Sequence, residues 1–193
     1  MRPATASAPD SEPVRPRGPF YRLSPSRQRR TMELLAAGAA VQLAFFLRFE
    51  RRMTRTGGPG IIAFELAGED GSAAILQRWG ESGRAAARSS LRLDFVFPAT
   101  YAPLQALGCL AAARGLAGTR HPALAGAAPA LAWAQLAAAG FDYVENVALL
   151  VALDHDGRGA RLARRAALTK FVLLAPGWAY MATAAVVGRR SAR

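Results

Sequence analysis

A long apolar segment, residues 123–153, encloses the polar run Phe141-Asp142-Tyr143-Val144-Glu145-Asn146. A helix needs about 20 mostly apolar residues to cross a lipid bilayer, and this segment exceeds that length. Ionisable side chains at such depth are costly, so by default they mark a functional site. The segment therefore predicts an integral membrane protein with a polar centre inside the bilayer.

Three further segments have the length and apolar character of membrane-spanning helices. With the first segment they predict an all-α fold, a bundle of four transmembrane helices. Between the first two spans, residues 73–90 carry apolar side chains such as Trp79 on one side and arginines on the other. That pattern indicates either an amphipathic interfacial helix on the membrane surface or a cap packed on the other helices. The predicted spans are residues 31–49, 91–113, 123–153 and 166–187.

Both ends of the chain are basic. Residues 1–30 contain six prolines and seven arginines but few large apolar residues, which is typical of a disordered tail. The membrane domain is then expected at residues 31–188, followed by a short basic tail at 189–193. Because arginines are about equally frequent beyond the two ends of the predicted spans, the positive-inside rule leaves the orientation in the membrane open.

The composition narrows the function classes. A net charge of +12 would suit a nucleic-acid-binding protein, but the arginines lie between apolar runs and no binding motif accompanies them. With 52% hydrophobic residues, the charge is better explained by basic flanks of membrane helices, so no nucleic-acid partner is predicted. The chain has one cysteine and two histidines, none of them clustered, so neither a metal site nor a cofactor is expected.

Four antiparallel spans bring one end of each span to the same side of the membrane. Asp94 in the second span and Lys170 in the fourth are each about seven residues from the middle of their helix, so both lie ~10 Å from the midplane on that side. Glu145 and Asn146 of the third span lie ~8 Å from the midplane on the same side. These four side chains can therefore share one layer, with Asp142 nearer the centre of the bilayer.

The second span and the connector before it complete the candidate site. Asp94, Tyr101 and Gln105 recur at helical spacing and share one helix face, and Pro98 is expected to kink or loosen the first turns. The connector that holds Glu65 covers the same side of the bundle, which makes it a candidate lid over a polar pocket. The candidate ligand-binding residues are Glu65, Asp94, Tyr101, Asp142, Glu145, Asn146 and Lys170.

The charges of this layer do not balance. Asp94, Asp142 and Glu145 supply up to three negative charges, against one ammonium from Lys170, the single lysine of the chain. In a poor dielectric, excess carboxylates pair, bind a cation or stay protonated. A proton, an inorganic cation and an amine are therefore candidate ligands. The alternative is a lysine–carboxylate hub with bound water that holds the four helices together.

Polar and aromatic motifs are spread over the apolar part of the chain, namely Phe64-Glu65-Leu66-Ala67-Gly68, Trp79-Gly80, Leu93-Asp94-Phe95-Val96-Phe97 with Tyr101, Phe141-Asp142-Tyr143-Val144-Glu145-Asn146 and Lys170-Phe171. With these motifs, residues 34–187 resemble a group of small uncharacterised bacterial membrane proteins. The resemblance implies a four-helix integral membrane protein and carries no known activity. A bundle with intramembrane carboxylates is also similar in outline to the EXPERA group of sterol isomerases and sterol-binding proteins, a likeness of fold rather than of motifs.

Three functions are compatible with this sequence. The leading hypothesis is a multi-pass protein of the cell membrane that binds or transports a cation, an amine or a lipid-like molecule in the polar pocket. The second is a membrane enzyme acting on a lipid or isoprenoid, in which a carboxylate is the acid–base group and Lys170 adjusts its pKa. The third is a structural or accessory membrane subunit. The lipid bilayer is the one partner that the sequence predicts, and protein partners stay open.

Overall fold

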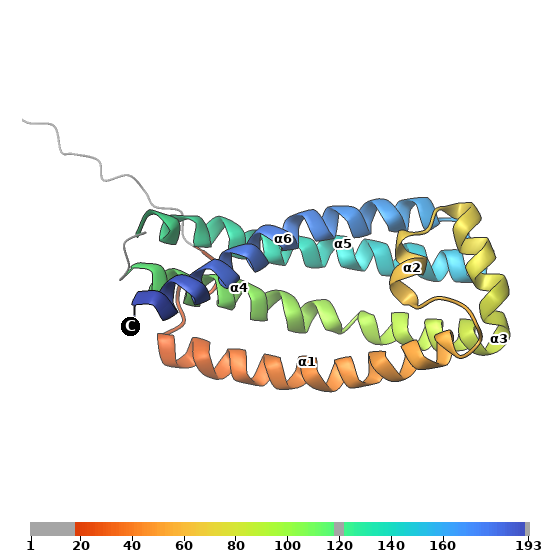
Figure 1. Cartoon of the computed structure of the whole chain (residues 1–193), viewed down its shortest axis with the longest axis horizontal. Coiled ribbons are helices and arrows are strands. Elements are labelled where there is room, and N and C mark those ends of the chain that lie inside the picture. The colour runs from red at the N-terminus through yellow and green to blue at the C-terminus, as the bar shows by residue number, and fades with distance from the viewer. Residues whose placement is uncertain (1–17, 118–121, 192–193) are drawn as a thin grey trace, which may run out of the picture.

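A computed structural model describes residues 18–117 and 122–191 of the chain, and within these residues all regular secondary structure is helical, in agreement with the predicted fold class. The elements are α1 (Pro25–Thr54), α2 (Ile61–Leu66), α3 (Glu69–Asp94), α4 (Phe97–Ala117), the 3-10 helix η1 (Pro122–Ala127), α5 (Ala128–Asp154) and α6 (Ala160–Ser191). Figure 1 shows an elongated bundle in which α1, α4, α5 and α6 run along the long axis. α2 and the first turns of α3 lie near the right-hand end of that view.

Three helical segments are long and apolar enough to cross a membrane. They are residues Pro25–Thr54, Ala123–Asp154 and Ala160–Arg189. α3 and α4 pass the same test together, but the pair is bent by 48° at a short break. By length and composition, the described part of the chain therefore offers three spans, or four when the bent pair is counted as one span.

α1 begins and ends outside its predicted limits of residues 31–49. The hydroxyl of Ser24 accepts a hydrogen bond from the backbone N–H of Arg27 at 3.4 Å, and Pro25 occupies the first turn, where its missing N–H costs no hydrogen bond. These two local signals start the helix inside the predicted disordered tail, residues 1–30. The part of that tail before residue 18 lies outside the described residues.

The predicted interfacial helix and second span are divided differently in the structure. α3 runs to Asp94 and α4 begins at Phe97, so Asp94 ends one helix instead of lying within the second span. Gly80 lies inside α3 with φ 55° and ψ −162°, a conformation that side chains other than glycine rarely adopt, and it kinks the helix. Pro98 lies in the first turn of α4, where proline is tolerated because no backbone donor is needed there.

The first part of α3 is a cap on the bundle. Figure 1 shows these turns crossing the end of the bundle before the chain turns along α1 towards α4. Leu76 and Trp79 of this part are fully buried. The packing agrees with the cap, one of the two alternatives for residues 73–90, because the apolar side of the helix faces the other helices.

The third predicted span, residues 123–153, is divided between η1 and α5, and the fourth lies within α6. α6 begins at Ala160, before the predicted start at residue 166, and continues to Ser191, inside the predicted tail at 189–193. The turn between the two helices contains Asp156 and Gly157, whose φ angles are 50° and 95°. Because α6 starts early, Lys170 lies about three turns inside the helix.

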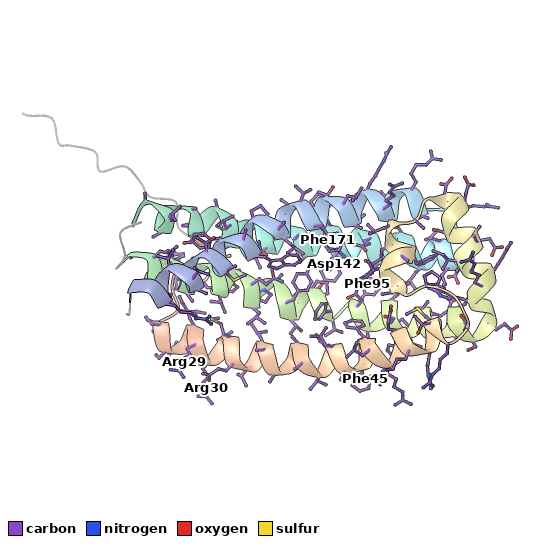
Figure 2. All side chains as sticks on the ribbon, viewed as in Figure 1. Arg29, Arg30, Phe45, Phe95, Asp142 and Phe171 are labelled. Atoms are coloured by element: carbon purple, nitrogen blue, oxygen red, sulfur yellow. The ribbon has the colours of Figure 1, made fainter. Side chains whose placement is uncertain are left out.

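The polarity of the bundle is partly inverted relative to that of a soluble protein. Large apolar side chains face outward along α1, for example Leu34 and Val41, which are 67% and 60% exposed. Charged side chains on α5 and α6 are buried, for example Glu145, which is 1% exposed. Figure 2 shows Phe45 projecting from the outer face of α1, while Asp142 lies among the helices. Apolar side chains thus cover much of the outside, and charged groups lie within.

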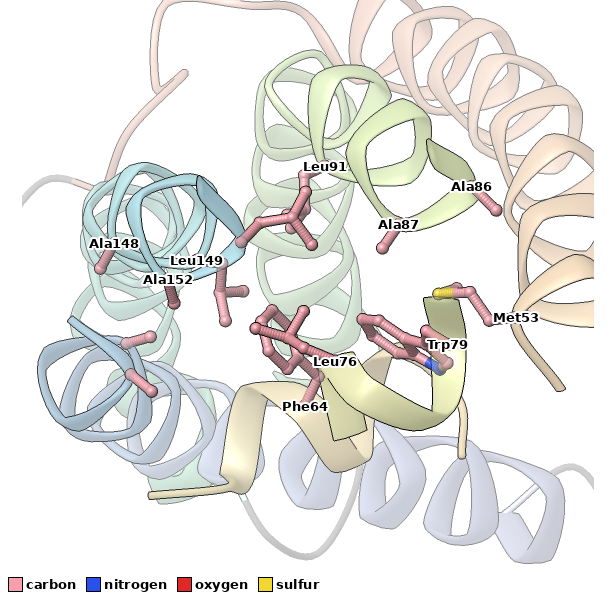
Figure 3. Packing of buried hydrophobic residues seen from close by; sticks show 13 residues of the cluster. Met53, Phe64, Leu76, Trp79, Ala86, Ala87, Leu91, Ala148, Leu149 and Ala152 are labelled. Atoms are coloured by element: carbon pink, nitrogen blue, oxygen red, sulfur yellow. The ribbon is translucent and has the colours of Figure 1, made fainter. Parts of the chain in front are cut away.

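One buried apolar cluster holds α2 against the rest of the bundle. The rings of Phe64 in α2 and Trp79 in α3 have centroids 5.0 Å apart. Met53, Leu76 and Leu149 belong to the same cluster, so it joins α1, α2, α3 and α5 (Figure 3). With Phe64 anchored in this way, the next residue, Glu65, is carried into the bundle.

Candidate functional site

Three polar side chains of α5 point into the bundle. Asp142, Glu145 and Asn146 are buried, whereas Tyr143 and Val144 between them are 37% and 44% exposed. Positions i, i+3 and i+4 share one face of a helix, so the spacing of the run separates a polar inner face from an apolar outer face. The local sequence alone therefore fixes which of these side chains meet the neighbouring helices.

Lys170 of α6 lies between two of these carboxylates. Its Nζ is 2.9 Å from Asp142 Oδ1 and 2.6 Å from Glu145 Oε2, and all three side chains are almost fully buried. Ion pairs at such burial are screened by salt much less than pairs at the surface. The single lysine of the chain is thus the counter-ion of the polar run on α5, and the pair joins α5 to α6.

Tyr101 of α4 contacts the other side of Asp142. Its hydroxyl donates a hydrogen bond of 2.8 Å to Asp142 Oδ2, while Lys170 occupies Oδ1. The ring of Phe97, one turn earlier, packs on Tyr101 with centroids 5.1 Å apart. Both oxygens of Asp142 therefore have partners, and this carboxylate links α4, α5 and α6.

Glu65 reaches the same cluster from α2. It is 8% exposed, and its carboxyl lies beside that of Glu145 and close to Lys170. Burial raises the pKa of the Glu65 carboxyl above its ordinary value, while the Lys170 ammonium opposes this shift. Sequence reasoning placed Glu65 in a covering connector, and the structure shows how far its side chain enters the bundle.

Two hydrogen bonds outside the cluster position α2, which is too short to hold its own place. The backbone N–H of Ile61 donates to Glu50 Oε2 of α1 at 3.0 Å, and the indole of Trp79 donates to the Pro59 carbonyl at 2.7 Å. A side chain at Gly60 would collide with the Glu50 carboxylate, so glycine is what allows this close contact. α1 and α3 therefore both hold the N-terminal end of α2.

Asp94 lies at the edge of the cluster. It is half-buried and close to the Asn146 amide, without a well-aligned hydrogen bond. Both polar atoms of that amide, and Oε1 of Glu145, are buried without a hydrogen-bond partner among the described residues. Because buried polar groups are almost always satisfied by protein or water, these atoms offer acceptors and donors that the protein itself does not use.

The predicted polar face of the second span is not a single helix face. Asp94 and Tyr101 lie on opposite sides of the break between α3 and α4, although both reach the surroundings of Asp142. Gln105 does not join them, because its Oε1 accepts a hydrogen bond from the exposed Trp178 at 2.6 Å. The prediction of one continuous face was wrong because the break falls at Phe95 and Val96, so Asp94 and Tyr101 belong to different helices.

Gln135 is a buried polar residue that the candidate set missed. Its Nε2 donates to the carbonyl of Leu173 at 3.3 Å, and its Oε1 has no partner among the described residues. Pro176 disrupts the hydrogen bonding of α6 in this turn, and a side chain at Gly177 would collide with Gln135. Gln135 lies seven residues before Asp142, so its helical spacing was the signal that could have found it.

The cluster carries more acid than base. The carboxyl groups of Glu65, Asp94, Asp142 and Glu145 surround the single ammonium of Lys170. Three of these carboxyl groups were expected close together from the sequence, and α2 brings Glu65 beside them as the fourth. Within the described ranges, no group of three or more His, Cys, Asp or Glu side chains is arranged to hold a metal ion. The seven predicted ligand-binding residues thus lie in one cluster, with Asp94 at its edge.

No protein-family model matches the chain, and no curated protein or solved structure matches it either. The resemblance to small bacterial membrane proteins, drawn from motifs such as residues 141–146, stays a prediction.

Proposed function

We propose that this chain is a multi-pass integral membrane protein of the cell membrane that binds a small cation, either a protonated amine or a proton, at the cluster around Lys170. One observation carries the proposal. A single ammonium lies between the buried carboxylates of Asp142 and Glu145, beside two further carboxyl groups that it does not neutralise. Ionisable groups inside apolar helices are expensive, and most of those known serve a function.

The distribution of apolar surface supports the membrane part of the proposal. The most apolar stretch of α1 has a mean hydropathy of 1.5, yet only 6% of it is buried. Soluble monomers rarely expose contiguous apolar patches of more than a few hundred Å², and such patches mark contacts with a membrane or a partner. Arg48, Arg51 and Arg52 follow this stretch and match the basic flank expected where a span meets the headgroups.

The chemistry of the cluster supports a cation as the ligand. An external ammonium offers the same N–H donors that Lys170 presents to Asp142 and Glu145. Glu145 Oε1 and the amide oxygen of Asn146 are buried acceptors without a partner in the described chain, and Asp94 adds a carboxyl group beside them. A second cation there would reduce the repulsion among the four carboxyl groups, and a proton would do so by neutralising one of them.

α2 supports a route to the cluster. It is six residues long and lies between Gly57-Gly58-Pro59-Gly60 and Ala67-Gly68, two segments that permit backbone rotation. Moving α2 outward would withdraw Glu65 and uncover Glu145 and Lys170 from the end of the bundle. We therefore assign α2 the role of a lid that carries one of the site's own carboxyl groups.

A structural hub is the second candidate function. It is favoured by the completeness of the contacts around Asp142, whose two oxygens are occupied by Tyr101 and Lys170 on different helices. A hub of this kind holds α4, α5 and α6 in register and needs no external ligand. The two candidates predict different effects of making Glu145 neutral. A cation site would lose its ligand, whereas a hub would lose stability.

Thermal unfolding of the purified protein in detergent separates the candidates. Wild type, Glu145→Gln and the surface control Glu81→Gln are each melted with Na⁺, K⁺, a series of primary amines and tetramethylammonium, which has no N–H donor. A ligand at 100 times its Kd stabilises the folded state by about 2.7 kcal/mol, so Tm should rise by about 5–10 °C for wild type and for the control. Glu145→Gln should fold and lose that rise.

One outcome would count against cation binding, and another against the proposed N–H contacts. If neither cations nor amines shift the wild type and Glu145→Gln melts well below it, the cluster is a hub. If tetramethylammonium shifts the wild type as much as primary amines do, the N–H donors are irrelevant and the proposed contacts are wrong. A change in Tm with pH that is lost in Glu145→Gln, without an amine effect, identifies the cation as a proton.

A further inference from the structure

A second charged site lies on the surface, apart from the cluster around Lys170. It is an open cleft of about 550 Å³ between the end of α1 and the part of α3 that follows the kink. Small-molecule sites typically have volumes of ~300–1,000 Å³, so the cleft is large enough for a ligand. Its lining includes Arg52, Arg55 and Thr56 from the end of α1, and Ser82, Ala86 and Ser89 from α3.

The two arginines of the cleft have no acidic partner. Neither Arg52 nor Arg55 forms an ion pair with a carboxylate of the described residues, whereas Arg84 and Arg161 pair with acidic residues of other elements. Basic residues at the end of a helix interact favourably with its dipole, which accounts for arginine at these positions. The dipole does not explain why two serine hydroxyls of α3, those of Ser82 and Ser89, line the same cleft.

The hydroxyl groups divide into two kinds. Thr56 Oγ1 donates to the Met53 carbonyl at 2.6 Å, and Ser89 Oγ donates to the Ala85 carbonyl at 3.0 Å. With their protons engaged, these two oxygens can still accept hydrogen bonds from a ligand. Ser82 Oγ makes no hydrogen bond within the described residues, so its proton is available to a ligand oxygen. The cleft thus combines cationic donors with hydroxyl acceptors.

We propose that this cleft binds a phosphate group joined to a polyol. The guanidinium groups of Arg52 and Arg55 suit a phosphate because each presents paired N–H donors in a planar fork. The hydroxyls of Thr56 and Ser89 suit the O–H groups of a glycerol or a similar polyol. Two sources share this chemistry, the headgroup of an anionic glycerophospholipid and a soluble glycerol phosphate.

The surroundings of the cleft match a lipid. Phe45 is about half exposed and lies seven residues before Arg52, on the same face of α1. At 1.5 Å per residue, Phe45 lies ~10.5 Å along the helix from Arg52, which is close enough for an acyl chain to lie on α1 below a bound headgroup. Figure 2 shows Phe45 on the outer face of this helix. The cleft and the cluster around Lys170 share no residues, so the phosphate site does not depend on the cation site.

Native mass spectrometry of the detergent-purified full chain tests the proposal, with three probes: phosphatidylglycerol, phosphatidylcholine with the same acyl chains, and glycerol 3-phosphate. Two double variants remove the same charge from the same helix. Arg52→Gln with Arg55→Gln empties the cleft of cations, and Arg30→Gln with Arg51→Gln is the matched control. A third variant, Ser89→Leu, narrows the cleft and leaves its charge unchanged.

We expect the wild type to prefer phosphatidylglycerol to phosphatidylcholine. The cleft double variant should weaken that binding about tenfold or more, since it removes charge-assisted hydrogen bonds, and the control by less than about twofold. Ser89→Leu should also weaken it. If glycerol 3-phosphate is the one probe that binds, and its binding depends on Arg52 and Arg55 in the same way, the cleft recognises the soluble ester. Equal losses in both double variants, or full binding by Ser89→Leu, would overturn the proposal.

Discussion

Replacing Lys170 with methionine is the most direct perturbation of the cluster. Methionine is unbranched and adaptable, so it removes the ammonium while it keeps most of the side-chain volume. The change deletes the contacts of 2.9 and 2.6 Å and leaves Asp142 and Glu145 without their counter-ion. Removing one partner of a buried pair costs about 3–5 kcal/mol. At ~2–4 °C per kcal/mol for a chain of this length, we expect Tm to fall by about 6–20 °C.

The assay is thermal unfolding in detergent, followed by tryptophan fluorescence, with an exposed ion pair as the control. Arg161 Nη2 is 3.2 Å from Glu69 Oε2, but these side chains are 70% and 47% exposed. Exposed pairs contribute ~0–1 kcal/mol, so Arg161→Gln should lower Tm by less than about 4 °C. The two variants each remove one cation from an ion pair and differ mainly in burial.

A double-mutant cycle identifies the partner of Lys170. If the contact with Glu145 matters as the geometry indicates, the variant with both Lys170→Met and Glu145→Gln should be less destabilised than the sum of the single variants by at least ~1 kcal/mol. The reason is that Glu145→Gln removes one of the charges that Lys170→Met leaves uncompensated. A Lys170→Met protein that melts within about 2 °C of wild type, with additive effects in the double variant, would refute the reasoning.

Three further substitutions test how α2, α3 and α6 are held. Trp79→Phe removes the donor to the Pro59 carbonyl and leaves a cavity beside Phe64, so we expect a loss of about 2–4 kcal/mol in thermal unfolding and faster limited proteolysis near α2. Gly80→Ala forces alanine to φ 55°, which should cost about 1–3 kcal/mol, and a wild-type Tm would contradict the kink. Gly177→Ala displaces the buried side chain of Gln135 and should cost about 1–3 kcal/mol in the same assay, whereas an unchanged Tm would show that this turn of α6 is loosely packed.

Helical periodicity explains why much of the cluster could be placed from the sequence. Asp142, Glu145 and Asn146 are close in sequence, so their common face depends only on local helix geometry. Lys170 lies in another helix, but an antiparallel pair with a short turn restricts which of its residues can meet them. α5 ends at Asp154, one residue beyond the predicted limit, although it starts five residues later than predicted, so the polar run keeps its expected distance from that end of the helix. The shared helix face and the common depth of these residues can therefore be predicted from their spacing in the sequence.

The course of the chain between α1 and α4 could not be read in the same way. Residues 69–117 are helical apart from a short break, and an apolar pattern continues across it, so periodicity does not mark where α3 ends. Gly80 kinks its helix through a backbone angle that leaves no trace in the apolar pattern. Glu65 is carried into the bundle by α2, which is held by contacts between residues distant in sequence, such as Phe64 with Trp79 and Trp79 with Pro59. Tertiary contacts decide these features.

The strengths of the contacts indicate where a closed cluster can open. Separating α5 from α6 would break the buried Lys170 ion pairs and also the packing between these two long helices, which is more extensive than between any other two elements. Moving α2 would break two hydrogen bonds, from Ile61 and Trp79, and would expose the ring of Phe64. Those losses amount to about 1 kcal/mol for each hydrogen bond and ~1.5–3 kcal/mol for the ring, and the rehydration of Glu65 offsets part of them. Opening a path for a cation at α2 therefore costs less free energy than separating the long helices. A variant that loosens α2, such as Trp79→Phe, should bind a primary amine faster than wild type.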